Sequence, residues 1–358
     1  MKCKKILTAL LAAACTMSGC HGDLDIMQDN KLSASNMWID ESDAETATYG
    51  IYLYMRDALK SVHDIYLCWG EFRNGLWGAG TNKTLSGVDQ TQVRTSTMSS
   101  SNAYADWSVM YKTVNQANLI LKHVPEMGIS ESVRNFSLGN AYFSRAWCYF
   151  WIARIWGDAP LALTGYESTG GDLYLPRAPK AEIFARIESD LTEAERYVTD
   201  NSDKAVATPA AVQMLKADYA LWMYRVAGGG SSYLTMAEKA IEALNLSASR
   251  LESDYAQVFS SANKLNKEVI FAVHQANGEA VNGPGYYLGW NSNYVEAAYQ
   301  NNPVPITGGN QWWWYTDRYK ALLTSVEGDT RTKLTYNRAD YGTTIKSIEW
   351  TEKGVGQM

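Results

Sequence analysis

The chain has 358 residues, and 46% of them are hydrophobic, which is enough for one large folded domain or two small ones. Its formal net charge of −6 argues against nucleic acid as a partner, because binding to phosphates needs a basic face. The 13 Trp and 23 Tyr residues far outnumber the 7 Phe residues. Since Trp and Tyr combine a flat apolar face with a hydrogen-bonding edge, this balance favours half-exposed contact surfaces as well as core packing.

The first twenty residues have the pattern of a secretion signal. Three lysines precede an apolar run over residues 6–15, and small residues then lead to Cys20. The apolar run is too short for a membrane-spanning helix, which takes ~20 residues. We expect cleavage before Cys20 and lipidation of Cys20, so that a lipid tethers the mature protein to a membrane. The alternative is a secreted protein in which Cys20 has no such role.

The whole sequence predicts four segments, each with its own pattern. Residues 1–19 are the signal peptide and residues 20–41 a lipidated tether. Residues 42–265 form a helical domain, with a first helix from Ser42, a loop-like segment over 64–101, and further helices over 103–124, 132–156, 179–198, 208–227 and 233–246. Residues 266–358 are rich in loops, with a β-branched run over 268–273 that predicts a strand and a short helix within 312–335.

Helix 132–156 is apolar nearly all round, so we expect it at the centre of the domain. Only Arg145 and Arg154 interrupt its apolar stretch, and each needs a carboxylate or carbonyl partner if buried. The succession of amphipathic helices with short turns is typical of tetratricopeptide-type hairpins with degenerate repeats. The predicted fold class is mainly α, with helical hairpins, irregular loop-rich insertions and little β structure.

The sequence contains no recognisable catalytic, metal-binding or cofactor-binding motif. The four histidines are scattered, and the three consecutive glycines from Gly228 lack the lysine of a phosphate loop. Cys68 and Cys148 remain in the mature chain, and their spacing leaves open whether they pair. Glycoside hydrolysis needs two carboxylates across a groove. The acids of helix 179–198 (Glu188, Asp190, Glu193 and Glu195) instead look like solvated helix-face charge, so hydrolysis is a minor alternative.

Aromatic side chains in irregular segments are the candidate ligand-binding residues, because a ring in a loop is free to face solvent. Rings of this kind can stack on the C–H faces of sugars, while Asn and Arg side chains bind hydroxyl groups. Packing between helices is the alternative role for any one of these rings. The candidates fall into two clusters: Trp69, Arg73, Asn74 and Trp77, and Tyr286, Tyr287, Trp290, Asn291, Trp312 and Trp314.

Several motifs in this order resemble the SusD/RagB family, the surface glycan-binding lipoproteins of Bacteroidota. The strongest is the segment from Ala141 to Leu161, with its Arg145-Ala146 pair, aromatic run and Gly-Asp-Ala-Pro turn. Weaker matches are Glu71-Phe72-Arg73-Asn74, Asn115-Gln116-Ala117-Asn118, Pro176-Arg177-Ala178 and Asn266-Lys267-Glu268, with Asn74 and Gln116 replacing an acid and an arginine of the family. Family members are usually longer, so residues 266–358 resemble an incomplete C-terminal region, whether by fragmentation or natural truncation.

The resemblance implies a function that composition alone does not. It implies a non-catalytic lipoprotein of the outer membrane that captures an oligosaccharide at the cell surface and delivers it to a SusC-like TonB-dependent β-barrel transporter. Lipid on Cys20 would be its membrane contact, and neither a cofactor nor nucleic acid would bind. The alternative from another class is a helical-repeat surface lipoprotein that acts through protein–protein contacts alone.

Overall fold

The computed structural model describes residues 37–79, 88–168, 170–171, 173–276, 313–323 and 325–329, together with four two-residue strands near the C-terminus. These strands are β5 (Tyr336–Asn337), β6 (Thr344–Ile345), β7 (Ile348–Glu349) and β8 (Val355–Gly356), paired β5 with β8 and β6 with β7. Two further antiparallel pairs join β1 (Trp77–Ala79) to β4 (Trp313–Tyr315) and β2 (Ala159–Pro160) to β3 (Arg177–Ala178).

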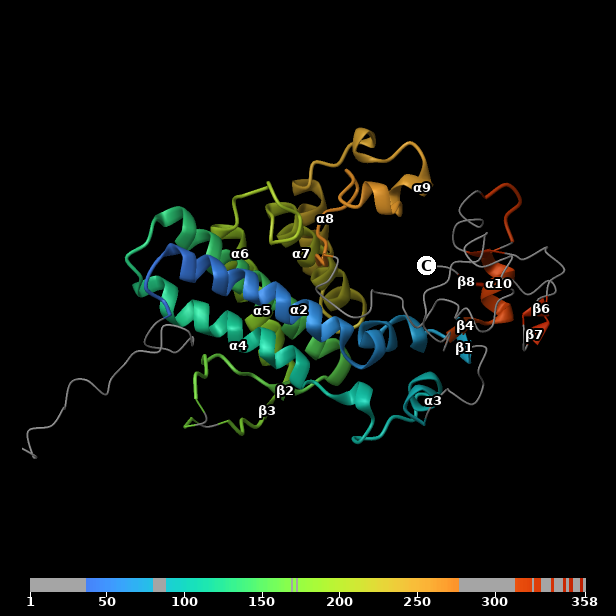
Figure 1. Ribbon diagram of the computed structural model, residues 1–358, viewed down its shortest axis with the longest axis horizontal. Coiled ribbons are helices and arrows are strands. Elements are labelled where there is room, and N and C mark those ends of the chain that lie inside the picture. Colours follow the sequence, from blue (N-terminus) through green and yellow to red (C-terminus); the bar gives the residue numbers. More distant parts are fainter. Residues whose placement is uncertain are drawn as a thin grey trace, which may run out of the picture.

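Helices dominate the described part of the chain (Figure 1). Six long helices are α2 (Glu41–Trp69), α4 (Ser108–His123), α5 (Glu131–Trp156), α6 (Lys180–Tyr197), α7 (Pro209–Arg225) and α8 (Ser231–Ala243). Shorter helices are α3 (Val88–Thr95), α9 (Tyr255–Val258) and α10 (Asp317–Leu323), and the 3-10 turns include η1 (Glu71–Arg73). The predicted fold class, mainly helical with little β structure, is confirmed.

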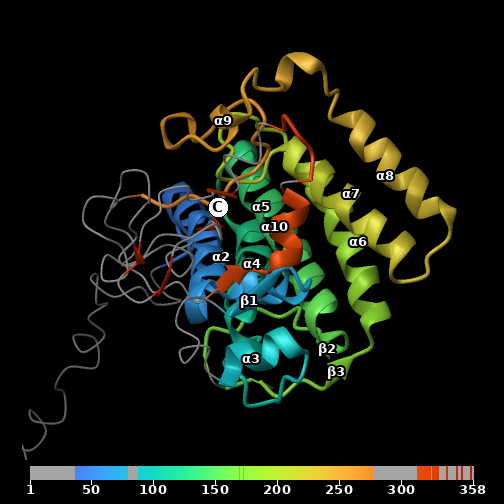
Figure 2. The same ribbon diagram turned by 90° about the vertical axis from the view of Figure 1, so that its right-hand side faces the viewer.

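Helix α5 lies at the centre of the helical layer, as its all-round apolar sequence predicts. It packs against α2, α4 and α6, and Phe143, Tyr149 and Phe150 are fully buried in the main core (Figure 1). The rings of Trp147, Trp151 and Trp156 are half-buried and pack on the same core. Neighbouring helices pack as α4 with α5, α5 with α6 and α7 with α8, which is the hairpin arrangement that the sequence indicates (Figure 2).

The first helix begins earlier and ends later than the sequence predicts. Asp40, rather than Ser42, is the N-cap: its carboxylate accepts from the backbone N–H of Asp43, and the Asp43 carboxylate accepts from that of Asp40. The helix then continues to Trp69 because Ile65, Cys68 and Trp69 stay on its buried face. The segment 64–101 is therefore not one loop; it also contains η1, β1 and α3.

The start of α7 agrees with prediction because its cap is explicit. Thr208 caps α7 by accepting a hydrogen bond from the backbone N–H of Ala211, and Pro209 occupies the first helical position. The predicted strand over 268–273 is wrong: these residues pair with no strand among the described residues. The backbone N–H of Ala272 donates to the carbonyl of Lys204 at 2.9 Å, and that of Val269 donates to the carbonyl of Asn266 at 3.2 Å.

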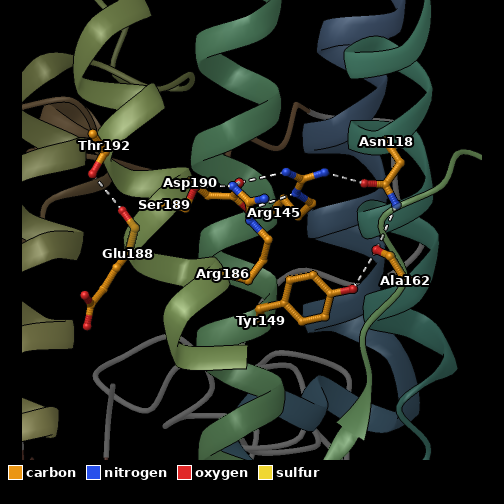
Figure 3. Close-up of polar contacts among 9 residues, drawn as sticks. All are labelled: Asn118, Arg145, Tyr149, Ala162, Arg186, Glu188, Ser189, Asp190 and Thr192. Atoms are coloured by element: carbon orange, nitrogen blue, oxygen red, sulfur yellow. Dashed lines mark hydrogen bonds and ion pairs between the residues drawn. The ribbon is translucent and has the colours of Figure 1, made fainter. Parts of the chain in front are cut away.

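Arg145 is tied into a buried polar network that joins three helices (Figure 3). Its Nε and Nη2 donate to both oxygens of Asp190 at 2.8 and 2.7 Å, and its Nη1 donates to Asn118 at 2.7 Å. Arg186 adds a third cationic contact to Asp190 at 2.8 Å. Asp190 is thus fully buried and bound by two guanidinium groups, which corrects the prediction that it is a solvated charge.

The same network fixes the segment that follows β2. The amide of Asn118 donates to the carbonyl of Ala162 at 3.0 Å, and the Tyr149 hydroxyl donates to that carbonyl at 2.7 Å (Figure 3). Glu188 is likewise not a free surface acid, because its carboxylate accepts from the hydroxyls of Tyr219 and Tyr233 at 2.7 and 2.6 Å. Glu188 and Asp190 therefore hold neighbouring helices together.

The two remaining cysteines are not joined. Cys68 and Cys148 form no disulfide and are both buried in the main core, and burial raises the pKa of the Cys148 thiol well above its usual range. Within the described residues, no helix is long and apolar enough to cross a membrane.

Candidate functional site

The fold brings parts of the two predicted aromatic clusters together. Strand β1, from the first cluster, pairs antiparallel with β4, from the second (Figure 1). In this pair Trp77 lies opposite Tyr315 and Gly78 opposite Trp314. The pairing is extended by Thr316, whose backbone N–H and hydroxyl both donate to the carbonyl of Leu76, at 2.8 and 3.0 Å. The two paired strands are therefore separated by more than two hundred residues of chain.

Arg73 and Asn74 lie exposed at the edge of this strand pair, at the end of η1. The side-chain oxygen of Asn74 accepts a hydrogen bond from the backbone N–H of Leu76 at 2.8 Å, and its side-chain NH2 group donates to the Glu71 carboxylate at 3.2 Å. These two contacts fix the orientation of the Asn74 side chain. Gly75 takes a positive φ of 77°, which glycine adopts without strain. The Arg73 guanidinium has no hydrogen-bond or ion-pair partner among the described residues, and its donors stay available.

Helix α10 borders the same edge. Burial raises the pKa of the Tyr319 hydroxyl, and the charge of the Glu71 carboxylate raises it further. We call this region the η1–β4 surface and define it by Glu71, Arg73, Asn74, Tyr319 and the strands β1 and β4. It presents hydrogen-bond donors and acceptors next to an aromatic strand, which suits a ligand rich in hydroxyl groups.

The rings of Trp69 and Trp77 do not line this surface. They are only 8% and 6% exposed, because both belong to the main core. Trp69 donates its indole N–H to the carbonyl of Tyr104 at 2.8 Å and packs edge-on against Trp156. Trp77 packs edge-on against Phe72, with ring centroids 5.0 Å apart. The prediction that these two rings stack on a ligand is therefore corrected: packing within the core takes up their faces.

The other predicted site residues lie largely outside the described residues. Trp314 is placed in β4 by its backbone. Cys20, Tyr286, Tyr287, Trp290, Asn291 and Trp312 fall outside the described ranges, and their roles stay predictions.

A groove on another face of the molecule was missed by the sequence analysis. It has a volume of about 700 Å³ and runs between α4 and the segment after β2, with Trp107, Tyr111 and Tyr166 among its lining residues. Arg177 lies over the Trp107 ring at 4.7 Å, and the Tyr111 hydroxyl donates to the carbonyl of Pro160 at 2.6 Å. Trp107 and Tyr111 lie four residues apart on one helix face, a spacing that predicts a shared surface but does not separate it from packing.

In the described part of the chain, no group of three or more His, Cys, Asp or Glu side chains is arranged to hold a metal ion. The exposed donors Arg73 and Asn74 lie on a segment that connects elements of a helical scaffold, the kind of segment on which binding residues are often found.

Comparison with known proteins finds that this chain is similar to SusD-like proteins. Residues 79–222 match a family described as starch-binding and associating with the outer membrane. A SusD-like protein of Formosa agariphila is 26% identical over 190 residues, which cover 53% of this chain and 36% of that protein. The chain is therefore similar to SusD-like proteins over its helical part, and its match spans about a third of the length of this curated relative.

Solved structures agree with the fold. A SusD superfamily protein from Bacteroides fragilis superposes with a TM-score of 0.71 at 24% identity, covering 89% of this chain and 68% of that one. A laminarin-binding SusD-like protein superposes with a TM-score of 0.69 at 19% identity, covering 84% of this chain and 67% of that one. At these identities the superpositions establish a common architecture.

Proposed function

We propose that this protein binds an oligosaccharide at the η1–β4 surface without cleaving it. Similarity to SusD-like proteins carries the proposal, since the family model that matches residues 79–222 is described as starch-binding. The laminarin-binding neighbour supports a glycan ligand and makes laminarin a useful first probe.

The η1–β4 surface is the proposed site because it joins an exposed Arg–Asn pair to an aromatic strand. Arg73 supplies up to five N–H donors and the Glu71 carboxylate supplies acceptors, which together can bind sugar hydroxyls. The predicted rings of Tyr286, Tyr287, Trp290, Trp312 and Trp314 would supply the stacking face, with Asn291 as a further hydrogen-bonding group. Each ring that stacks on a sugar should contribute on the order of 1 kcal/mol to binding, by analogy with aromatic pairs.

The cellular role follows as a second part of the proposal. Lipid on Cys20 would hold the protein at the outer membrane, where the matching family is described as associating. There it would pass its glycan to a SusC-like TonB-dependent β-barrel transporter. A role limited to protein–protein contacts is the rival function, and glycoside hydrolysis is a minor one.

Affinity electrophoresis tests the binding function. The full chain is run through native gels that contain laminarin, starch and plant, host and microbial polysaccharides, and the gel extracts are assayed for released sugar. Retardation in at least one gel without sugar release supports the proposal. Sugar release would establish a hydrolase. Normal mobility in every gel, from protein shown to be helical by circular dichroism, would favour the protein-contact function.

Pull-down through the lipoprotein from solubilised outer membranes tests the transporter partnership. Recovery of a large β-barrel protein supports delivery to a transporter. A protein that binds glycan but never recovers a barrel would refute the partnership while leaving the binding function intact.

A further inference from the structure

A cavity of about 430 Å³ lies away from the η1–β4 surface, at the end of the α7–α8 hairpin. Its walls are the start of α7, the end of α8, the 3-10 turn that contains Arg250, and the extended segment around Val269. The two helices lie side by side in both views (Figures 1 and 2). Its volume is in the range of small-molecule sites, which run from about 300 to 1,000 Å³.

The residues that line this cavity include two cations, Lys204 and Arg250, and no carboxylate. Lys204 is held in place because its Nζ donates to the carbonyl of Asn266 at 2.7 Å, which leaves two further N–H donors on the ammonium group. Arg250 is half-buried, and its guanidinium has no hydrogen-bond or ion-pair partner among the described residues. The cavity wall therefore carries positive charge that the described protein groups do not neutralise.

The acids Glu195, Asp200 and Asp203 are engaged in other contacts. Asp200 accepts from the backbone N–H and the hydroxyl of Ser202, at 2.8 and 2.7 Å, and Asp203 accepts from the N–H of Ala205 at 2.8 Å. Glu195 reaches the cavity only through Gln213, and its two oxygens are both bound by Lys216 at 2.8 Å. These contacts keep the carboxylates in turns and in a surface ion pair.

The remaining walls suit a ligand with an uncharged body. Leu244, Val269 and Ile270 supply apolar surface, while Thr208, which is 3% exposed, places a hydroxyl at the start of α7. The Thr208 oxygen accepts from the N–H of Ala211, and its own O–H is left to donate. Two cations and a hydroxyl around one concave space can bind the oxygens of a single anionic group.

We propose that this cavity binds the carboxylate or sulfate group of a small ligand, such as an acidic sugar. Arg250 would bind the anion directly through its planar fork of N–H groups, and Lys204 would add a second charge-assisted hydrogen bond. The site is separate from the η1–β4 surface and does not depend on glycan binding there.

Calorimetric titration of the full chain with sodium glucuronate, sodium sulfate and glucose, at low ionic strength and pH 7, tests this site. Glucuronate and glucose differ by one carboxylate, so glucuronate should bind and glucose should not. Tighter binding of glucuronate than of sulfate would identify an acidic sugar as the ligand. Sulfate that binds as tightly or better would identify the sulfate group itself.

Three variants assign any binding to this cavity. R250Q removes the charge and should weaken anion binding at least tenfold, whereas R250K keeps the charge but loses the planar fork and should bind with an affinity between those of R250Q and wild type. R225Q, at the exposed far end of α7, makes the same charge change outside the cavity and should bind within about twofold of wild type. Absence of binding to either anion by the wild type, or equal loss in R225Q and R250Q, would overturn the proposal. Glycan retardation would be unaffected by that result, because it reports the other surface.

Discussion

The buried network around Arg145 should make Asp190 one of the least replaceable side chains in the fold. In D190N the shape of the side chain is kept and its charge is removed. The two oxygens of Asp190 together accept three N–H contacts from Arg145 and Arg186, at 2.7 to 2.8 Å. An asparagine offers one oxygen, and its NH2 group would face guanidinium donors.

The expected cost follows from the burial of the pair. Arg145 is 5% exposed and Asp190 is fully buried, so removing the carboxylate leaves a charge without its partner inside the core. Breaking a buried ion pair in this way costs about 3–5 kcal/mol of unfolding free energy. The matched control is D218N, because Asp218 meets Arg154 at 3.4 Å with 53% of its side chain exposed. Exposed pairs contribute roughly 0–1 kcal/mol.

Urea denaturation followed by circular dichroism measures both variants against wild type. The reasoning predicts a large fall in the unfolding midpoint for D190N and almost none for D218N. A loss below about 1 kcal/mol in D190N would refute it, since an isolated charge at that depth has no other compensation. The double variant R145M/D190L gives a second check: replacing both charges by apolar groups should recover much of the stability that D190N loses.

Two further predictions concern other parts of the fold. The Glu167 carboxylate accepts a hydrogen bond 2.5 Å long from Lys122, and this bond is the largest cause that lowers the pKa of Glu167. Because the folded pKa is lowered, the ionised carboxylate stabilises the fold above the unfolded pKa of about 4.3, and this stabilisation is lost as pH falls through the folded pKa. The difference in urea midpoint between wild type and E167Q should therefore shrink from about pH 5 to about pH 3; a constant difference would contradict this. In G139A the new Cβ would lie 2.7 Å from a methyl carbon of Val198 and 3.0 Å from its backbone nitrogen, which should lower the free energy of unfolding by about 1–3 kcal/mol. In the control variant G128A the new Cβ meets nothing within 4 Å, so this variant should melt like wild type.

The sequence predicts the helices well where the signals are local. The start of α7 follows from a threonine cap and a proline at the first position, and the central place of α5 follows from a helix that is apolar nearly all round. The need of Arg145 for a buried partner is also readable. The identity of that partner was missed, although Asp190 lies on the apolar face of α6, three residues after Ile187 and four before Ala194.

The candidate site is harder to predict because its parts are far apart in the chain. Nothing local in Trp77 separates a core ring from a ligand-binding ring, and the structure places it against Phe72. The pairing of β1 with β4 depends on long-range closure, which a single sequence does not encode as a pattern. Arg73 and Asn74 were predicted from their setting in a polar segment, and both are exposed.

Titration of a retarding polysaccharide, with laminarin as the first probe, into the full chain and its R73A variant tests the central claim most directly. Arg73 is exposed and free of described partners, so R73A should fold like wild type, unlike W77A, which would remove a core ring at a cost of about 3–5 kcal/mol. The account predicts saccharide binding by wild type that weakens about tenfold in R73A and is unchanged in R225Q. Wild-type affinity in a folded R73A variant would contradict the assignment of the glycan site to the η1–β4 surface.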